Sequence, residues 1–395
     1  MDSSQRTALR LEYKAFLGRS DRVLLTGHSH QAWPDAARDA GARAFDDAAT
    51  FVDDKWQARI FPLVESVGSR ILDRLGFDRA DGITFGANTH ELVYRVLSAL
   101  PLGARVVTTT SEFHSLHRQL SRLGETDLEV EWVDARPRES LASRILTALE
   151  GRRTDLLALS AVLFEDAWIV AELGEIASRA VDLGVTVLVD AYHAFNVVPL
   201  DWGPARDALF VTAGGYKYAQ LGEGVCFLRV PSKTELRPRF TGWFADFAAL
   251  EEPRVFDGGR PAQVRYGAGG ARFAGSTFDA TSLYRASAVL DVFDRHGLDV
   301  PTLRAESIRQ TSLITDSLQR AGLQLASSEE SARRAGFVSV RLKNAEHVVR
   351  ALRERQVYVD ARGELLRLGP APYLEDDEIL RAVAELVRVV ASHPR

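Results

Sequence analysis

The sequence predicts an α/β fold with a parallel sheet covered by helices, followed by a smaller α+β unit. Up to residue 230, short β-branched runs alternate with helical patterns rich in Arg, Ala and Leu. Because these runs are apolar on both faces and are separated by helices, they are typical of buried parallel strands. The seven predicted strands are 81–86, 104–110, 128–134, 155–164, 185–190, 208–215 and 224–230.

The second half of the chain has a different pattern. After Phe273 come long helical segments, an FVSVRL strand, a shorter helix and a final strand pair with a helix. A chain of 395 residues is also too long for one compact core. We therefore expect a large α/β domain over 46–285 and a small α+β domain over 286–395. Residues 1–45 should pack on the small domain and the cleft.

Composition excludes several classes of protein. A net charge of −5 gives no electrostatic reason to expect nucleic acid or an anionic membrane as a partner. The single Cys226 excludes an intrachain disulfide framework and a multi-cysteine metal site, and it fits a reducing compartment. No signal-peptide pattern and no apolar run of about 20 residues is present. We expect a cytoplasmic protein with a small-molecule substrate and no metal.

One lysine stands out in a chain that uses arginine almost everywhere. Only five of the 49 basic residues are lysines, and Lys217 lies between two apolar runs in VTAGGYKYAQLGEGVCFLRV. A partly desolvated lysine has a lowered pKa and can form a Schiff base, whereas a guanidinium stays protonated. Taken alone, a lysine beside a turn is usually a surface residue.

Two further sites give Lys217 a chemical context. Asp190 ends an apolar strand 27 residues earlier, and a buried carboxylate needs a cation such as a protonated ring nitrogen or a structural arginine. Asn88 and Thr89 open a helix after a strand, where free N–H groups suit a phosphate, although Asn88 alone could be a simple N-cap. Together these features indicate pyridoxal 5′-phosphate (PLP), with an aldimine on Lys217, its ring nitrogen on Asp190 and its phosphate on Asn88-Thr89.

The chain resembles the fold type I PLP enzymes of the aspartate aminotransferase superfamily. Within them it is similar to the class V aminotransferase group, and most of all to kynureninases. The motifs that carry the resemblance, beside Asn88-Thr89 and Ser160, are GHSHQAWPD (27–35), SEFHS (111–115), Asp190-x-x-His193, YKY (216–218), TGWF (241–244), FAGSTFD (273–279) and RLGPAPY (367–373). The resemblance implies a large domain with a mainly parallel seven-stranded sheet and a smaller C-terminal α+β domain.

The resemblance also implies roles for individual residues. The catalytic group comprises Lys217, Asp190 and His193. The cofactor contacts are Asn88, Thr89, Phe113 stacked on the ring, Ser160, Asp190, His193, Tyr216 at the phosphate, Lys217, Trp243, and Ser276 with Thr277. The substrate contacts are Arg367 on the α-carboxylate, His28, His30 and Trp243. Because the family's GSTFD segment reaches the neighbouring subunit's phosphate, we expect a homodimer.

The reaction is less closely defined than the cofactor. We expect kynureninase-like cleavage or elimination at the β carbon of an α-amino acid. The alternatives are class V transamination, a cysteine S-conjugate C–S lyase, or a non-catalytic α/β binding protein that kept the fold. Cys226 lies within an apolar strand and is interpreted as a small hydrophobic residue, which excludes a desulfurase nucleophile. His28 and His30 are acid/base groups, substrate contacts or surface residues.

Overall fold

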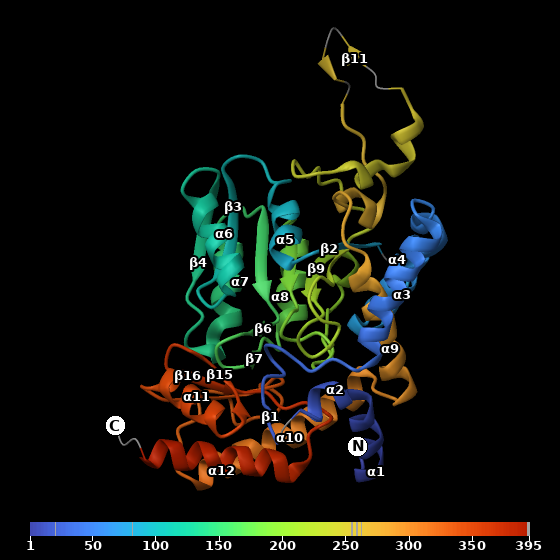
Figure 1. Ribbon diagram of the computed structural model, residues 1–395. Helices are drawn as coiled ribbons and strands as arrows, with labels where there is room; N and C mark the ends of the chain where they lie inside the picture. Colours follow the sequence, from blue (N-terminus) through green and yellow to red (C-terminus); the bar gives the residue numbers. More distant parts are fainter. Residues whose placement is uncertain (20, 81, 254–255, 258–259, 262, 393–395) are drawn as a thin grey trace.

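A seven-stranded sheet forms the centre of the molecule. The computed structural model describes residues 1–19, 21–80, 82–253, 256–257, 260–261 and 263–392. The strand order of the sheet is β2-β10-β9-β8-β5-β3-β4 (Figure 1). Its strands are β2 (Gly82–Gly86), β3 (Ala104–Thr109), β4 (Leu128–Val133), β5 (Leu156–Ser160), β8 (Thr186–Asp190), β9 (Leu209–Gly214) and β10 (Cys226–Val230). All seven predicted strands are confirmed, although Asp81 lies outside the described residues.

The predicted run at 155–164 divides into two elements. β5 ends at Ser160, and the next residues form a short hairpin from β6 (Val162–Leu163) and β7 (Trp168–Ile169). The main sheet is parallel except at β10, which runs antiparallel to β2 and β9. The connection from β9 to β10, residues 215–225, is too short for the crossover that a parallel neighbour requires. That connection carries Lys217.

Helices cover both faces of the sheet. Alternate residues of one strand point to opposite faces, so Leu156 packs with the α5 and α6 side chains while Leu157 packs with those of α7 and α8. The helices of this part are α3 (Ala36–Phe51), α4 (Phe61–Leu75), α5 (Thr89–Leu97), α6 (His114–Gly124), α7 (Leu141–Gly151), α8 (Leu173–Asp182) and α9 (Thr281–Arg295). This arrangement confirms the predicted α/β class.

The C-terminal part is an α+β unit. It contains a three-stranded antiparallel sheet in the order β13-β16-β15 and three helices. Its elements are α10 (Val300–Arg320), β13 (Val338–Arg341), α11 (Ala345–Glu354), β14 (Val357–Tyr358), β15 (Asp360–Arg362), β16 (Leu365–Leu368) and α12 (Asp376–Ser392). The predicted boundary at residue 285 falls inside α9, whose Tyr284 and Ala288 pack against Ala40 of α3. The division into domains therefore stays a proposal.

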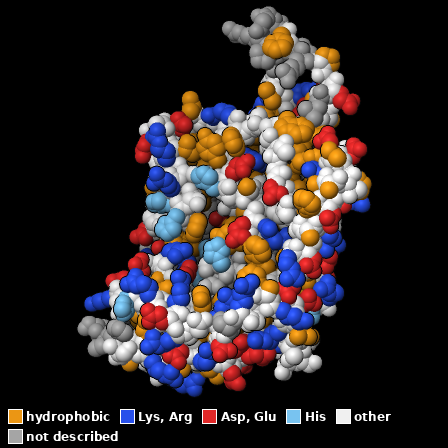
Figure 2. All heavy atoms as spheres, in the orientation of Figure 1, with side chains coloured by type: hydrophobic (Ala, Val, Ile, Leu, Met, Phe, Trp, Pro, Cys, Tyr) orange, Lys and Arg blue, Asp and Glu red, His pale blue; other side chains and the backbone are white. Residues whose placement is uncertain are grey.

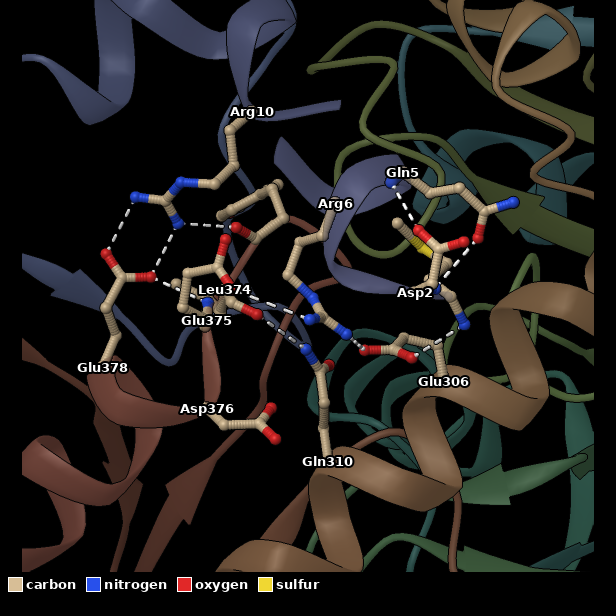
Figure 3. A network of polar contacts seen from close by, with 12 residues as sticks. Asp2, Gln5, Arg6, Arg10, Glu306, Gln310, Leu374, Glu375, Asp376 and Glu378 are labelled. Atoms are coloured by element: carbon tan, nitrogen blue, oxygen red, sulfur yellow. Dashed lines mark hydrogen bonds and ion pairs between the residues drawn. The ribbon is translucent and has the colours of Figure 1, made fainter. Parts of the chain in front are cut away.

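The N-terminal segment lies against this C-terminal unit. It comprises α1 (Ser3–Arg10), α2 (Lys14–Leu17) and β1 (Val23–Leu24), which pairs in parallel with β14. Arg6 donates to Glu306 of α10 at 2.9 Å, and Arg10 donates to Glu378 of α12 at 2.7 Å (Figure 3). Across the described parts of the chain, no helix combines the length and apolar character needed to cross a bilayer.

Candidate active site

Three predicted site residues meet at one edge of the main sheet. Ser160 ends β5 and Asp190 ends β8, and the two residues are partners in the parallel register. Lys217 follows β9, whose Thr212 is the partner of Asp190 on the other side. Because the carboxyl ends of parallel strands share an edge, the fold itself brings these side chains together.

Lys217 is buried and contacts a histidine. Its side chain is 4% exposed, and its Nζ lies 2.8 Å from Nε2 of His193. The amine also lies 4.4 Å from the ring centre of Tyr192 and 5.2 Å from that of Phe113. Burial lowers the pKa of Lys217 to about 7, against the attraction of Asp190 and with help from the charge of Arg367. Near neutral pH a large share of this amine is therefore unprotonated and nucleophilic.

His193 is the hydrogen-bond partner of that amine. The imidazole is 6% exposed, and burial together with the charges of Lys217 and Arg367 holds its pKa well below the usual value. His193 is thus a neutral ring at pH 7, which can accept a hydrogen bond from Lys217 on one nitrogen.

Asp190 is a half-buried carboxylate that lacks a cation at contact distance among the described residues. Burial raises its pKa, which the backbone N–H of Tyr192 and the charge of Lys217 partly offset. That N–H donates to Oδ1 at 2.8 Å. No Lys, Arg or His among the described residues forms an ion pair with Asp190. A partly desolvated carboxylate without a described cationic partner fits a protonated ring nitrogen, and a buried amine follows one strand further on, so the residues present fit PLP.

A cleft of about 440 Å³ lies between this edge and the C-terminal unit. Seven predicted site residues line it: His28, His30, Phe113, His193, Tyr216, Lys217 and Arg367. The other predicted residues do not line the cleft. Its volume falls in the range of small-molecule sites. The cleft therefore joins the Lys217 amine to the side chains expected to bind a substrate.

Arg367 is placed at this cleft by β16, but one face of its guanidinium is already bound. Nε and Nη2 donate to the two carboxylate oxygens of Asp360 at 2.9 and 2.5 Å, and Nη1 donates to the carbonyl of Phe164 at 2.8 Å. A guanidinium has five N–H donors, so two remain for a ligand. Binding of an α-carboxylate by Arg367 would therefore use these two N–H groups.

His28 belongs to the same cluster and is not a surface residue. It is 0% exposed, stacks on Phe337 with ring centres 4.7 Å apart, and its Nε2 lies 2.7 Å from Oδ1 of Asp360. Burial and the charge of Arg367 lower the pKa of His28 to about 4, so the ring is neutral. Sequence reasoning missed Asp360, although an acidic residue seven positions before Arg367 on the adjoining strand was a usable signal.

Comparisons with known proteins agree with this geometry. Residues 303–386 match the family described as the kynureninase C-terminal domain. The kynureninase of Geobacillus thermodenitrificans is 24% identical over 362 residues, which cover 85% of this chain and 81% of that protein. The uncharacterized aminotransferase YcbU of Bacillus subtilis is 26% identical over 250 residues. The latter match spans 59% of each chain, less than two thirds of that relative.

Solved structures show the same fold over nearly the whole chain. The apo cysteine desulfurase of Thermococcus onnurineus superimposes with a TM-score of 0.79 at 16% identity, over 98% of both chains. C-DES with glycine covalently linked to its PLP cofactor superimposes with a TM-score of 0.79 at 17% identity, over 96% of this chain and 98% of that one. The chain is thus similar to class V aminotransferase-like, PLP-dependent enzymes. Its fold is fold type I, as the sequence predicts.

Glu112 is a second residue near this site that sequence reasoning missed. It is 3% exposed and accepts hydrogen bonds from Ser160 Oγ at 2.5 Å and Thr109 Oγ1 at 2.6 Å. Burial raises the pKa of Glu112 to about 7, against the two hydroxyl donors and with a contribution from Asp190. Like Asp190, Glu112 is a carboxylate that follows an apolar strand, and the same argument would have found it.

The expected phosphate end of the site lies at the start of α5. Asn88 is the N-cap, and its Oδ1 accepts from the backbone N–H of Glu91 at 2.9 Å, so its side chain is used by the helix itself. Thr89 begins the helix, and the first turn of a helix is where backbone N–H groups can bind an anion. Tyr216 stacks with the exposed His30, ring centres 5.1 Å apart.

Cys226 lies in β10 behind this site and is 4% exposed. Burial raises the pKa of its thiol to about 11, so the sulfur stays protonated at neutral pH. A protonated buried thiol is a poor nucleophile, in agreement with the interpretation of Cys226 as a small hydrophobic residue.

Trp243, Ser276 and Thr277 are not brought to the cleft of the same chain. Trp243 is 41% exposed and stacks on Phe244 with ring centres 4.3 Å apart. Ser276 and Thr277 are exposed, and the GSTFD segment is anchored beside α5 by Arg95, which donates to the Phe273 carbonyl at 2.7 Å. Arg95 lies more than one helical turn from Thr89. Within one chain these three residues therefore do not complete the site. The two segments that carry them lie beside the C-terminal part of α5 and not beside its start.

Proposed function

We propose that the chain is a class V aminotransferase-like, PLP-dependent enzyme that acts on an α-amino acid and cleaves or eliminates a group at its β carbon, as a kynureninase-like enzyme does. The observation that carries the proposal is the buried, largely neutral Lys217 amine beside neutral His193, one strand away from a carboxylate with no cation. When bound, PLP supplies an electron sink for the charge that develops at the α carbon.

Residues of the chain would bind the cofactor and carry out the proton transfer. Asp190 holds the ring nitrogen protonated, and Ser160, oriented by Glu112, lies beside it in the register. The α5 start at Asn88-Thr89, together with Tyr216, would hold the phosphate, and Phe113 would pack against the ring. Lys217 moves the proton at the α carbon, and His193 accepts a hydrogen bond from its Nζ and so keeps the amine oriented. Burial of both groups excludes water from the proton transfer.

Arg367 supports the assignment of an amino-acid substrate. Its two remaining N–H groups can donate to the two oxygens of an α-carboxylate, because a planar guanidinium binds carboxylates with parallel hydrogen bonds. The carbonyl of Phe164 and the carboxylate of Asp360 fix the plane of that guanidinium. An anchored carboxylate determines which bond at the α carbon is aligned for cleavage.

The test is a product analysis of the purified enzyme loaded with PLP. Amino acids with a γ-carbonyl, with a β-leaving group and with neither are compared. Alanine with a released acid marks hydrolytic cleavage, pyruvate with ammonia marks elimination, and an oxo acid without a released group marks transamination. Lys217→Ala serves as the control without the amine. Turnover by Lys217→Ala equal to that of the wild type would remove Lys217 from the mechanism, and transamination alone would overturn the β-carbon assignment.

We also propose a homodimer that completes the site. Trp56, Phe61, Trp243, Phe244, Phe247 and Phe278 form an aromatic cluster in which Trp243 and Phe247 are exposed by 41% and 38%. Hydrophobic side chains gather at the base of the projection that carries β11 (Phe256–Asp257) (Figures 1 and 2). Exposed aromatic patches of this kind mark protein interfaces. A second copy seated there would bring its Ser276 and Thr277 to the phosphate end.

A further inference from the structure

The outer part of the cleft carries more positive charge than the proposed reaction uses. Besides Lys217 and Arg367, three arginines line it: Arg22, Arg353 and Arg362. Among the described residues that line this cleft, Asp360 is the single carboxylate. The amine is needed for chemistry and Arg367 for an α-carboxylate, so three guanidinium groups are left without an assigned partner.

Asp360 does not neutralise these arginines. Both of its oxygens accept from Arg367, and Oδ1 also lies 2.7 Å from Nε2 of His28. Arg362 approaches Oδ2 only to 3.6 Å, beyond hydrogen-bond distance. Burial opposes the ionisation of Asp360, but His28 and Arg367 more than offset it and hold its pKa below the usual range. The charge of Asp360 is thus already engaged by Arg367, and Arg362 is left under-compensated.

Arg353 and Arg22 have no carboxylate within ion-pair distance among the described residues. Arg353 is exposed at the end of α11, with its guanidinium 5.6 Å from the ring centre of Tyr358. Arg22 donates through Nη2 to the carbonyl of Phe16 at 2.6 Å, and its buried Nε has no hydrogen-bond partner.

Arginines elsewhere in the chain are commonly paired, which makes this group unusual. Arg333 pairs with Glu172 at 2.6 Å, and Arg309 pairs with Asp376 at 2.8 Å. Guanidinium groups that converge on one cleft without a hydrogen-bonded carboxylate among the described residues attract anions and are suited to bind carboxylate or phosphate oxygens.

We propose that the cleft takes an α-amino acid whose side chain carries a second anionic group, and that Arg353 and Arg362 bind this group. The proposal rests on the proposed function for the α-carboxylate end, and it adds the chemical class of the side chain. The volume of about 440 Å³ leaves room for a side chain beyond the reacting bond. A carboxylate or another oxyanion at the far end of that side chain supplies the charge that the outer cleft lacks.

The test compares two unreactive probes of similar length, glutarate with two carboxylates and butyrate with one. Their dissociation constants are measured by calorimetry at constant ionic strength on the PLP-loaded wild type, on Arg353→Gln, on Arg362→Gln and on the double variant. Arg341→Gln is the matched control, because Arg341 is an exposed arginine of the same unit that lies 3.7 Å from Glu364 and does not line the cleft. We expect the wild type and Arg341→Gln to bind glutarate at least about 10-fold more tightly than butyrate, and the double variant to lose this preference.

Equal binding of both probes by the wild type, or a preference that survives in the double variant, overturns the proposal. Folding of the variants is checked by their melting temperatures and by the visible absorption of bound PLP. A second arm compares KM for pairs of amino acids with and without a terminal carboxylate, and we expect the variants to raise KM for the acidic member alone. Failure of the proposed function would appear separately, as the absence of β-carbon products with intact glutarate preference.

Discussion

Nζ of Lys217 lies 2.8 Å from Nε2 of His193, and both side chains are buried in the wall of the cleft. A hydrogen bond between these two nitrogen atoms needs an N–H group on one of them and a lone pair on the other. With a neutral imidazole and an amine whose pKa is about 7, the pair holds such a proton across neutral pH. Because the protonation of Lys217 changes near neutral pH, the reactivity of its amine depends on the pH of the solution.

The first prediction follows from that amine. The pKa of Lys217 is lowered from 10.5 to about 7, and only the neutral amine condenses with an aldehyde. The neutral fraction therefore rises as pH rises through 7, and at pH 8 it is about nine tenths, whereas an ordinary lysine is almost fully protonated there. We expect the rate at which apoprotein is labelled by PLP and borohydride to rise between pH 6 and 8 and then level off. A rate that keeps rising towards pH 10 would contradict the lowered pKa.

The second prediction concerns Asp190. Replacing it by alanine removes the carboxylate that holds the ring nitrogen protonated, while Lys217 stays in place to bind PLP covalently. We expect Asp190→Ala to bind PLP with an altered visible spectrum and to lose on the order of 100-fold or more in kcat. Stopped-flow absorbance and steady-state kinetics check this, with Asp182→Ala on the sheet-covering helix α8 as the control. An unchanged kcat would remove Asp190 from the mechanism.

The third prediction uses the raised pKa of Glu112. A buried carboxyl with a folded-state pKa near 7 and an unfolded value near 4.5 binds more protons in the folded state between these pH values. Its contribution to the free energy of unfolding is therefore full below pH 4.5 and decreases as pH rises through 7. Glu112→Gln cannot titrate, so we expect its stability relative to the wild type to increase by a few kcal/mol across this window. Urea unfolding at pH 5 and pH 7.5 measures the difference; parallel stabilities at both values would refute it.

A fourth prediction concerns the ion pair between Arg367 and Asp360 in the wall of the cleft. The side chain of Arg367 is 2% exposed, and Asp360 is the carboxylate that compensates it. Removing one partner of a buried pair leaves the other charge uncompensated, so Asp360→Ala should reduce the free energy of unfolding by about 3–5 kcal/mol. Glu364→Ala, which removes the partner of exposed Arg341, should change it by less than about 1 kcal/mol. Equal effects of the two substitutions on chemical denaturation would contradict the assignment.

The fifth prediction tests the homodimer. Phe247→Asp places a charge in the exposed aromatic cluster, beside Trp243 and Phe244. A charge buried at an apolar interface is unfavourable, so we expect this variant to sediment as a monomer while its circular dichroism stays native. Its PLP affinity should fall because the partner's GSTFD segment is lost. Leu102→Asp, at an exposed leucine outside the cluster, is the control. A wild type that is monomeric and fully active would exclude the dimer.

The main sheet was predictable because most of its strands are short runs that are apolar on both faces and are separated by helical patterns, although β4 carries Glu129 and Glu131. The ends of those strands then located Asp190 and Lys217, since parallel strands share an edge, whereas Ser160 was expected from the family resemblance. The break of the 155–164 run after Ser160 was not predictable, because the residues that form the β6–β7 hairpin are as apolar as those of the strand.

The cleft wall was less predictable than the sheet edge. The sequence predicted the strand pair at 357–368, but the pairing of Arg367 with Asp360 depends on the register of that pair, which sequence reasoning did not work out. The sequence alone did not distinguish an exposed loop position from a buried one for His28. Its stacking on Phe337 shows that the ring is buried. Trp243 was expected at the cleft from a motif, but its place in space depends on a segment that packs along α5.

Two glycines join the N-terminal turn to the strand that carries Arg367. The N–H of Gly27 donates to the carbonyl of Gly369, and the N–H of Gly369 donates to Leu25, each at 2.8 Å. A Cβ at Gly27 would lie 2.6 Å from the Pro370 carbonyl, and one at Gly369 would lie 2.3 Å from the His28 ring, so neither position accepts a larger residue. The turn and the Arg367 strand therefore form one rigid piece. If the cleft opens, we therefore expect His28 and Arg367 to move away from Lys217 together. The Lys217 amine and the Arg367 guanidinium would then separate as parts of two rigid bodies.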